Sequence, residues 1–133
     1  MATTSALGLT VRVAADIETA QKRISAALKQ EGFGVLTEID VQSTLKQKLG
    51  VDFRPYKILG ACNPSLAHRA LTAAPEVGLL LPCNVVVRCA GGRTTVAAID
   101  ASAMLRVTGR DELEAVAADI DRRLTAVVEG VGS

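Results

Sequence analysis

Aromatic residues and net charge are both low in this chain of 133 residues. It has one tyrosine, two phenylalanines and no tryptophan, and its 15 basic and 14 acidic residues leave a formal net charge of +1. Proteins that bind nucleic acid generally carry a basic excess for the phosphate backbone and aromatic side chains on which bases stack. The composition therefore predicts no nucleic-acid partner.

Metal-binding and disulfide-forming residues are also few. The chain has three cysteines, no Cys-x-x-Cys pair and a single histidine, His68. Cys62 and Cys83 are 21 residues apart, so no zinc-ligand spacing can be written, and we expect no metal site. An odd number of cysteines favours the reduced thiols of a cytoplasmic protein over a disulfide framework.

Long apolar segments are absent as well. Residues 1–8 contain no positive region followed by an apolar run, which a secretory signal requires. The longest apolar run, around Pro82, is too short to span a bilayer, so we expect no membrane association. Apolar residues nonetheless make up 49% of the chain. They suffice for one domain, residues 1–133 with a core at about 7–129, built from leucine, valine, isoleucine and alanine.

The periodicity of these apolar residues predicts a mixed fold. Alternation predicts strands at residues 7–13, 33–41, 56–62, 79–88 and 93–99. Helical spacing predicts helices at 17–28, 41–49, 64–74 and 113–127. Asp16 is the predicted N-cap of the first and Gly32 its stop, and Thr108 and Asp111 form a capping box for the last. Gly91-Gly92 predicts a hairpin, so its two strands are antiparallel neighbours. These elements predict an α+β two-layer sandwich, with helices packed on one face of a mainly antiparallel sheet.

The predicted sheet has too few helices to cover it on both sides. Residues 79–87 are apolar at positions that would face both sides of a strand. A partner subunit is the simplest cover for the second face, and we expect a homodimer. Gly32-x-Gly34 follows a predicted helix rather than a strand, which is the wrong order for a dinucleotide-binding loop, and we expect no cofactor.

Two similar junctions concentrate the polar chemistry of the chain in apolar surroundings. They are Cys62-Asn63-Pro64 and Pro82-Cys83-Asn84. Asn63 is a favoured helix N-cap and Pro64 then occupies the first helical position. Cys62 precedes the cap, where the positive end of a helix favours a thiolate. Pro82 must lie at a strand start, an edge or a bulge.

These junctions also carry a family resemblance. Residues 56–71 and 78–87, preceded by residues 32–40, closely resemble domain-of-unknown-function family 302, a set of small bacterial and archaeal proteins. The resemblance extends from about Leu7 to Met104, and the Leu-Gly-Ala-Cys-Asn-Pro run is its most specific part. It implies a compact, dimeric α+β domain with an antiparallel sheet. No activity is established for the family.

The residues leave three functional hypotheses open. In the first, the two junctions meet and form a pocket for a small anionic or thiol-reactive ligand, lined by Cys62, Asn63, Cys83 and Asn84 with a contribution from Asp40. In the second, Cys62 is an activated nucleophile for sulfur transfer or redox sensing. In the third, the motifs are purely structural and only shape a dimer interface. The asparagines then satisfy backbone groups, the cysteines are small buried hydrophobes, and Asp40 caps a helix. Whether the protein is an enzyme is left open.

Overall fold

The computed structural model describes residues 2–132 and contains one six-stranded sheet. Every neighbouring pair of strands is antiparallel, in the order β1-β2-β6-β5-β4-β3. The strands are β1 (Thr3–Thr4), β2 (Gly8–Val13), β3 (Gly34–Asp40), β4 (Tyr56–Cys62), β5 (Cys83–Ala90) and β6 (Arg93–Ile99).

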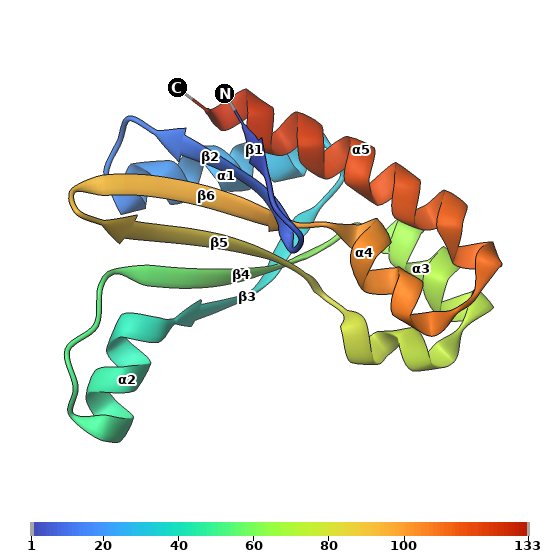
Figure 1. The fold of residues 1–133 in the computed structure, drawn as a ribbon, viewed down its shortest axis with the longest axis horizontal. Coiled ribbons are helices and arrows are strands. Elements are labelled where there is room, and N and C mark those ends of the chain that lie inside the picture. The colour runs from blue at the N-terminus through green and yellow to red at the C-terminus, as the bar shows by residue number, and fades with distance from the viewer. Residues whose placement is uncertain (1, 133) are drawn as a thin grey trace.

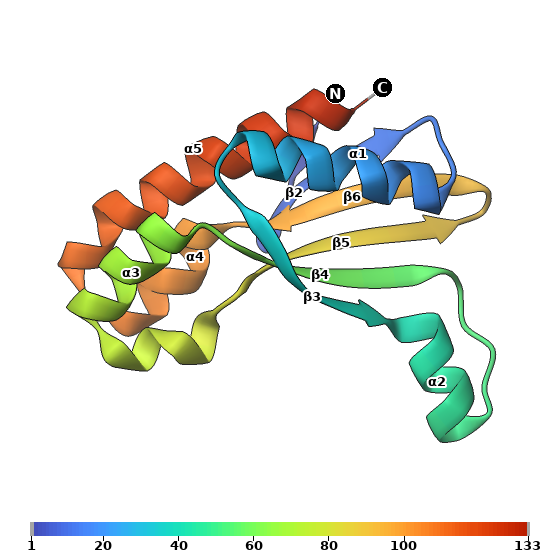
Figure 2. The same ribbon diagram turned by 180° about the vertical axis from the view of Figure 1, so that it is seen from behind.

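Five α-helices complete the α+β fold that the sequence predicts. They are α1 (Ile17–Gln30), α2 (Val41–Leu49), α3 (Pro64–Ala73), α4 (Ala101–Leu105) and α5 (Glu114–Val131). Figure 2 shows α1 in front of the strands and α5 along the same layer, while Figure 1 shows the opposite sheet face with no described helix in front of β4, β5 and β6. Helices α3 and α4 lie beyond one end of the sheet, and α2 projects from the other end (Figure 1). Within residues 2–132, no helix is long and apolar enough to cross a membrane.

The core lies between one face of the sheet and helices α1 and α5. Along β5, Cys83, Val85 and Val87 are buried while the residues between them are more exposed. This alternation follows from the strand geometry, which sends successive side chains to opposite faces. Against the buried face pack Ile24 and Leu28 of α1 and Val127 and Val128 of α5.

Short-range signals that the sequence contains are used as predicted. Asp16 caps α1 by accepting a hydrogen bond from the Thr19 N–H at 2.7 Å. Gly32 ends the same helix with a φ of 86°, a left-handed conformation that glycine adopts without steric cost. Gly91 and Gly92, with φ of 59° and 75°, form the turn between β5 and β6.

Two of the predicted boundaries are wrong. The strand predicted from residue 79 begins only at Cys83, because Pro82 has no N–H to donate to a ladder and residues Pro75–Leu80 form a 3₁₀-helix, η1. The capping box also fails. Thr108 donates its hydroxyl proton to the Leu105 carbonyl at 2.7 Å and so closes the preceding helical segment, while α5 starts at Glu114 without a side-chain cap. Helix α4 was not predicted.

Candidate functional site

Asn63 joins three elements at one end of the sheet. Its Oδ1 accepts a hydrogen bond from the Leu66 N–H at 3.2 Å, which caps α3, and its Nδ2 donates to the Glu31 carbonyl at 3.3 Å. The residue is 8% exposed. Gly32 leaves it room, since a Cβ there would lie 2.9 Å from Nδ2. Asn63 therefore fixes the start of α3 against the turn between α1 and β3.

A second side chain supports the same turn from α5. Arg123 donates from Nη1 to the Glu31 carbonyl at 3.1 Å, and its Nε lies 3.3 Å from a carboxylate oxygen of Asp119. Asp119 also pairs with Arg69 of α3 at 3.7 Å. These contacts tie α3 and α5 together behind the junction at Cys62.

The strand register brings the two Cys-Asn junctions to one place. Ala61 of β4 is the ladder partner of Cys83 of β5, so Cys62 lies one position beyond this pair. Cys62 is half-buried and Cys83 is 4% exposed. Both cysteines are free thiols. The end of β4 and the start of β5 are therefore neighbours, although 21 residues separate the cysteines in the chain.

Cys62, Asn63 and Cys83 line a single pocket of about 320 Å³. The pocket lies between these strand ends and the helical segments beyond the sheet. Its apolar walls include Phe33, Leu66, Leu71, Leu81, Leu105 and Ile120. Among the described residues, those that line it include no Asp, Glu, Lys, Arg or His. Nor does the described chain contain a group of three or more His, Cys, Asp or Glu residues placed to hold a metal ion.

The pocket environment changes the acidity of one thiol. Burial, together with the nearby Cys62 and the negative charge of Asp121, raises the pKa of Cys83 from 9.0 to about 11. Burial is the largest of these causes because a thiolate loses its hydration in apolar surroundings. At neutral pH, Cys83 is therefore a protonated thiol and a poor nucleophile.

Two residues of the predicted site lie elsewhere. Asn84 is exposed and projects from the sheet face opposite to Cys83, as expected for successive strand residues. Asp40 lies at the far end of β3, where it pairs in register with Lys57 and accepts a hydrogen bond from the Ser43 N–H at 3.0 Å. It caps α2. The structure thus brings together Cys62, Asn63 and Cys83, but neither Asn84 nor Asp40 lines their pocket.

Most of the pocket wall was not identified from the sequence. Leu66, Ala67, Ala70 and Leu71 form a recognisable apolar stripe on α3, which by itself indicates only a helix packed on a core. The walls contributed by Leu105 and Ile120 come from α4 and α5. No local pattern signals that these side chains leave a space between them.

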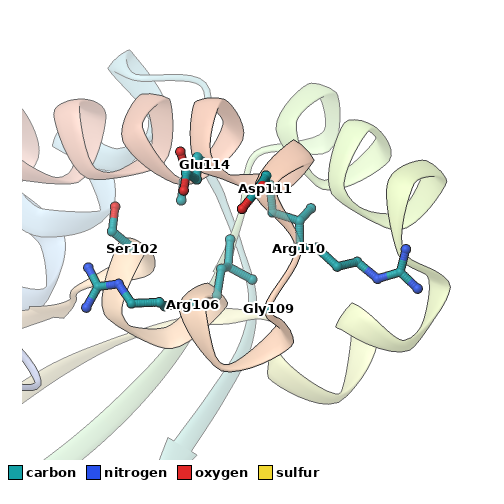
Figure 3. A pocket seen from close by; sticks show the side chains of 9 residues that line it. Ser102, Arg106, Gly109, Arg110, Asp111 and Glu114 are labelled. Carbon is teal, nitrogen blue, oxygen red and sulfur yellow. The ribbon is translucent and has the colours of Figure 1, made fainter.

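A second pocket of about 320 Å³ lies between α4 and the start of α5 and has charged walls. Figure 3 shows Arg106 and Arg110 extending in opposite directions, away from each other. Arg110 is already paired, with Glu76 at 3.1 Å and with Glu112 at 3.2 Å. Ser102 donates its hydroxyl proton to Asp121 at 2.5 Å. Because these groups do not converge, this pocket is the weaker candidate.

Comparison with known proteins assigns the chain to a family. The profile of the family described as "Domain of unknown function DUF302" matches residues 9–131. The chain belongs to the DUF302 family. The resemblance predicted from its sequence is thereby confirmed. The crystal structure of an uncharacterized conserved DUF302 protein from Bacillus stearothermophilus is similar, with 36% identity, a TM-score of 0.87 and coverage of 92% of this chain and 95% of that one. A search of curated proteins found no match.

Proposed function

We propose that this DUF302 protein is a small-molecule binding module whose site is the pocket lined by Cys62, Asn63 and Cys83. The observation that carries the proposal is the convergence of these residues, from two distant parts of the chain, on one concavity of about 320 Å³. Pockets for small ligands begin at about this size and are mainly apolar with a few polar groups.

The frame around the pocket supports this function. Asn63 is held by the Leu66 N–H and the Glu31 carbonyl, and Arg123 holds the same carbonyl from α5. A site whose walls are fixed before the ligand arrives loses less conformational entropy on binding. The hydrogen bonds of Asn63 therefore contribute to binding by ordering the wall.

The test is a variant that fills the pocket. Ala67 lines it from the partly exposed side of α3, so Ala67→Leu adds three carbons to the space while keeping a good helix former. Ala26→Leu, on the exposed side of α1, is the matched control. A fragment collection is screened against the wild type by ligand-observed NMR. We expect hits that Ala67→Leu loses and Ala26→Leu keeps. An absence of hits, or hits that both variants retain equally, would contradict the proposal.

A second function is favoured by the neighbouring thiols. Cys62 is half-buried, shares the pocket with Cys83 and immediately precedes the cap of α3. These features suit a nucleophilic thiol for sulfur transfer or redox sensing. The test is the alkylation rate of Cys62 as a function of pH, measured in a Cys89→Ser background. A midpoint well below the ordinary thiol value of ~8.5 supports this function, and a midpoint at or above it contradicts it.

We also infer that the protein works as a homodimer that buries the open face of the sheet. One row across this face is mainly apolar and joins five strands in register, through Ile39, Ile58, Val86, Ala97 and Thr10. Ile39 is 47% exposed, and the described helix α2 beside it has no buried residue. A second copy of the chain presents the same apolar sheet face and the same helix α2. One two-fold interface can therefore bury the open face and α2 of both copies. The cytoplasmic location stays a prediction.

A further inference from the structure

We propose that the ligand of the pocket at Cys62, Asn63 and Cys83 is a neutral, mainly hydrocarbon molecule. This inference rests on the proposed binding function and names the class of ligand. The position of Cys62 before a helix suggests an anionic ligand instead. The structure favours a neutral one because the Leu66 and Ala67 N–H groups at the start of α3 are already bonded to Asn63 and no charged side chain of the described residues lines the pocket.

No described side chain that lines the pocket can balance the charge of a ligand. Within the described chain, the lining residues include no cationic or anionic side chain. An ion transferred into such a space loses its hydration without a counter-charge, which costs several kcal/mol or more. Such a cost selects strongly for uncharged ligands.

The start of α3 is also a poor anion site. Pro64 has no N–H, the Leu66 N–H is bonded to Asn63 Oδ1, and the Ala67 N–H is bonded to the Asn63 carbonyl at 2.8 Å. Of the first four residues of this described helix, only Ser65 keeps an N–H without one of these partners, and Ser65 does not line the pocket. Asn63 has thus taken up the groups that would otherwise bind an anion at a helix N-terminus.

The remaining polar groups of the wall are few and uncharged. The hydroxyl of Thr37, an exposed residue of β3, can donate or accept a hydrogen bond without adding a charge. The Oδ1 and Nδ2 of Asn63 each make a structural hydrogen bond. The buried Cys83 keeps its proton, because burial raises its pKa to about 11. Thiols are weak hydrogen-bond donors and acceptors but are polarizable, so they contact hydrocarbon well. Cys62 and Cys83 therefore contribute to an apolar surface.

The rim of the pocket extends the same chemistry outward. Leu36, at the irregularity in the β3 ladder, is 67% exposed, and Leu71 of α3 is 40% exposed. Both also line the pocket. Exposed leucines around an apolar hollow provide a path by which a hydrocarbon chain can enter without crossing a polar barrier.

The test compares two ligands that share a chain and differ in charge. Octanol and octanoate are titrated at neutral pH against wild-type protein loaded with N-phenylnaphthylamine, a neutral fluorophore that brightens in apolar surroundings. The two ligands differ by one charge that the pocket wall leaves unpaired. We therefore expect octanol to displace the fluorophore at a concentration at least about tenfold lower than octanoate requires. Ala67→Leu should bind the fluorophore weakly, whereas Ala26→Leu should bind it as the wild type does.

A charge placed at the rim provides a second, independent readout. Leu71→Lys adds a cation beside the pocket, and Leu79→Lys adds the same cation at a residue that is 89% exposed and does not line it. Leu71→Lys should shift the preference several-fold toward octanoate, and Leu79→Lys should not. If octanoate and octanol bind the wild type with equal affinity, the inference of a neutral ligand is overturned but the proposed binding function is not. Two results would refute the pocket itself as the site. In one, the fluorophore, octanol and octanoate bind Ala67→Leu as well as they bind the wild type; in the other, none of them binds either protein.

Discussion

At the scale of single residues, Cys62 and Cys83 stand in the same dipeptide but have different chemical environments. Cys62 ends a strand and is half-buried, while Cys83 begins a strand and faces the core. Cys83 belongs to the core and to the pocket wall, and this burial raises its pKa. Of the two pocket thiols, Cys83 is therefore the poorer nucleophile at neutral pH.

The pKa of Cys83 predicts how stability depends on pH. Folding raises this pKa from 9.0 to about 11, so the folded protein keeps a proton that the unfolded chain releases. The resulting stabilisation is complete below pH 9 and is lost as pH rises toward 11. It amounts to about 3 kcal/mol at most. We expect urea unfolding of the wild type to show this loss. Cys83→Ala should lack the corresponding slope and Cys89→Ala should retain it, and equal slopes in all three proteins would contradict the assignment.

At the scale of secondary-structure elements, the start of α3 depends on one side chain. Asn63 supplies the cap and the link to the turn between α1 and β3. The identical residue of the other junction, Asn84, projects from β5 and is exposed. Both asparagines follow a cysteine, but Asn63 is buried and caps a helix whereas Asn84 is exposed on a strand.

This asymmetry predicts different costs for one substitution. Asn63→Ala removes the cap and leaves the buried Leu66 N–H without its partner, whereas the Glu31 carbonyl keeps its hydrogen bond from Arg123. We therefore expect the substitution to lower the free energy of unfolding by ~1–3 kcal/mol. Asn84→Ala should change it by less than ~0.5 kcal/mol. Urea denaturation monitored by circular dichroism measures both. Equal effects of the two substitutions would show that Asn63 has no special role in the fold.

Local signals explain which elements were predictable from sequence. The caps at Asp16 and Asn63 and the turn at Gly91-Gly92 depend on a few adjacent residues, and each was predicted correctly. The apolar run at residues 79–82 was misassigned because a buried strand and a short 3₁₀-helix present the same pattern. The pocket depends on how α3, α4 and α5 pack together. The sequence pattern of any one of these helices does not predict the cavity that remains between them.

At the scale of the whole molecule, the fold is one-sided. Helices α1 and α5 cover one face of the sheet, and the other face is left open with α2 projecting beside it (Figure 1). The sequence indicated this imbalance through residues that are apolar on both faces of one strand. A dimer formed through the open face removes apolar surface from water on both copies.

Val86 lies in the middle of the apolar row and provides the test of the dimer. Val86→Glu places like charges on both copies at the interface, so we expect it to convert a dimer into a monomer while the circular dichroism spectrum is unchanged. Ala26→Glu, on an exposed position of α1, should leave the dimer intact. Sedimentation velocity distinguishes these states. A wild type that is monomeric, or a Val86→Glu variant that still dimerises, would refute this interface.

The most direct measurement of the central claim is methyl NMR of the wild-type protein titrated with N-phenylnaphthylamine. We predict saturable shifts of the methyl groups that line the pocket, at Leu66, Leu81, Leu105 and Ile120, with little change at Val127 and Val128, which lie in the core away from it. Shifts confined to Ile58 and Val86 on the open sheet face, or no saturable shift at the pocket, would contradict the claim that Cys62, Asn63 and Cys83 line a ligand-binding site.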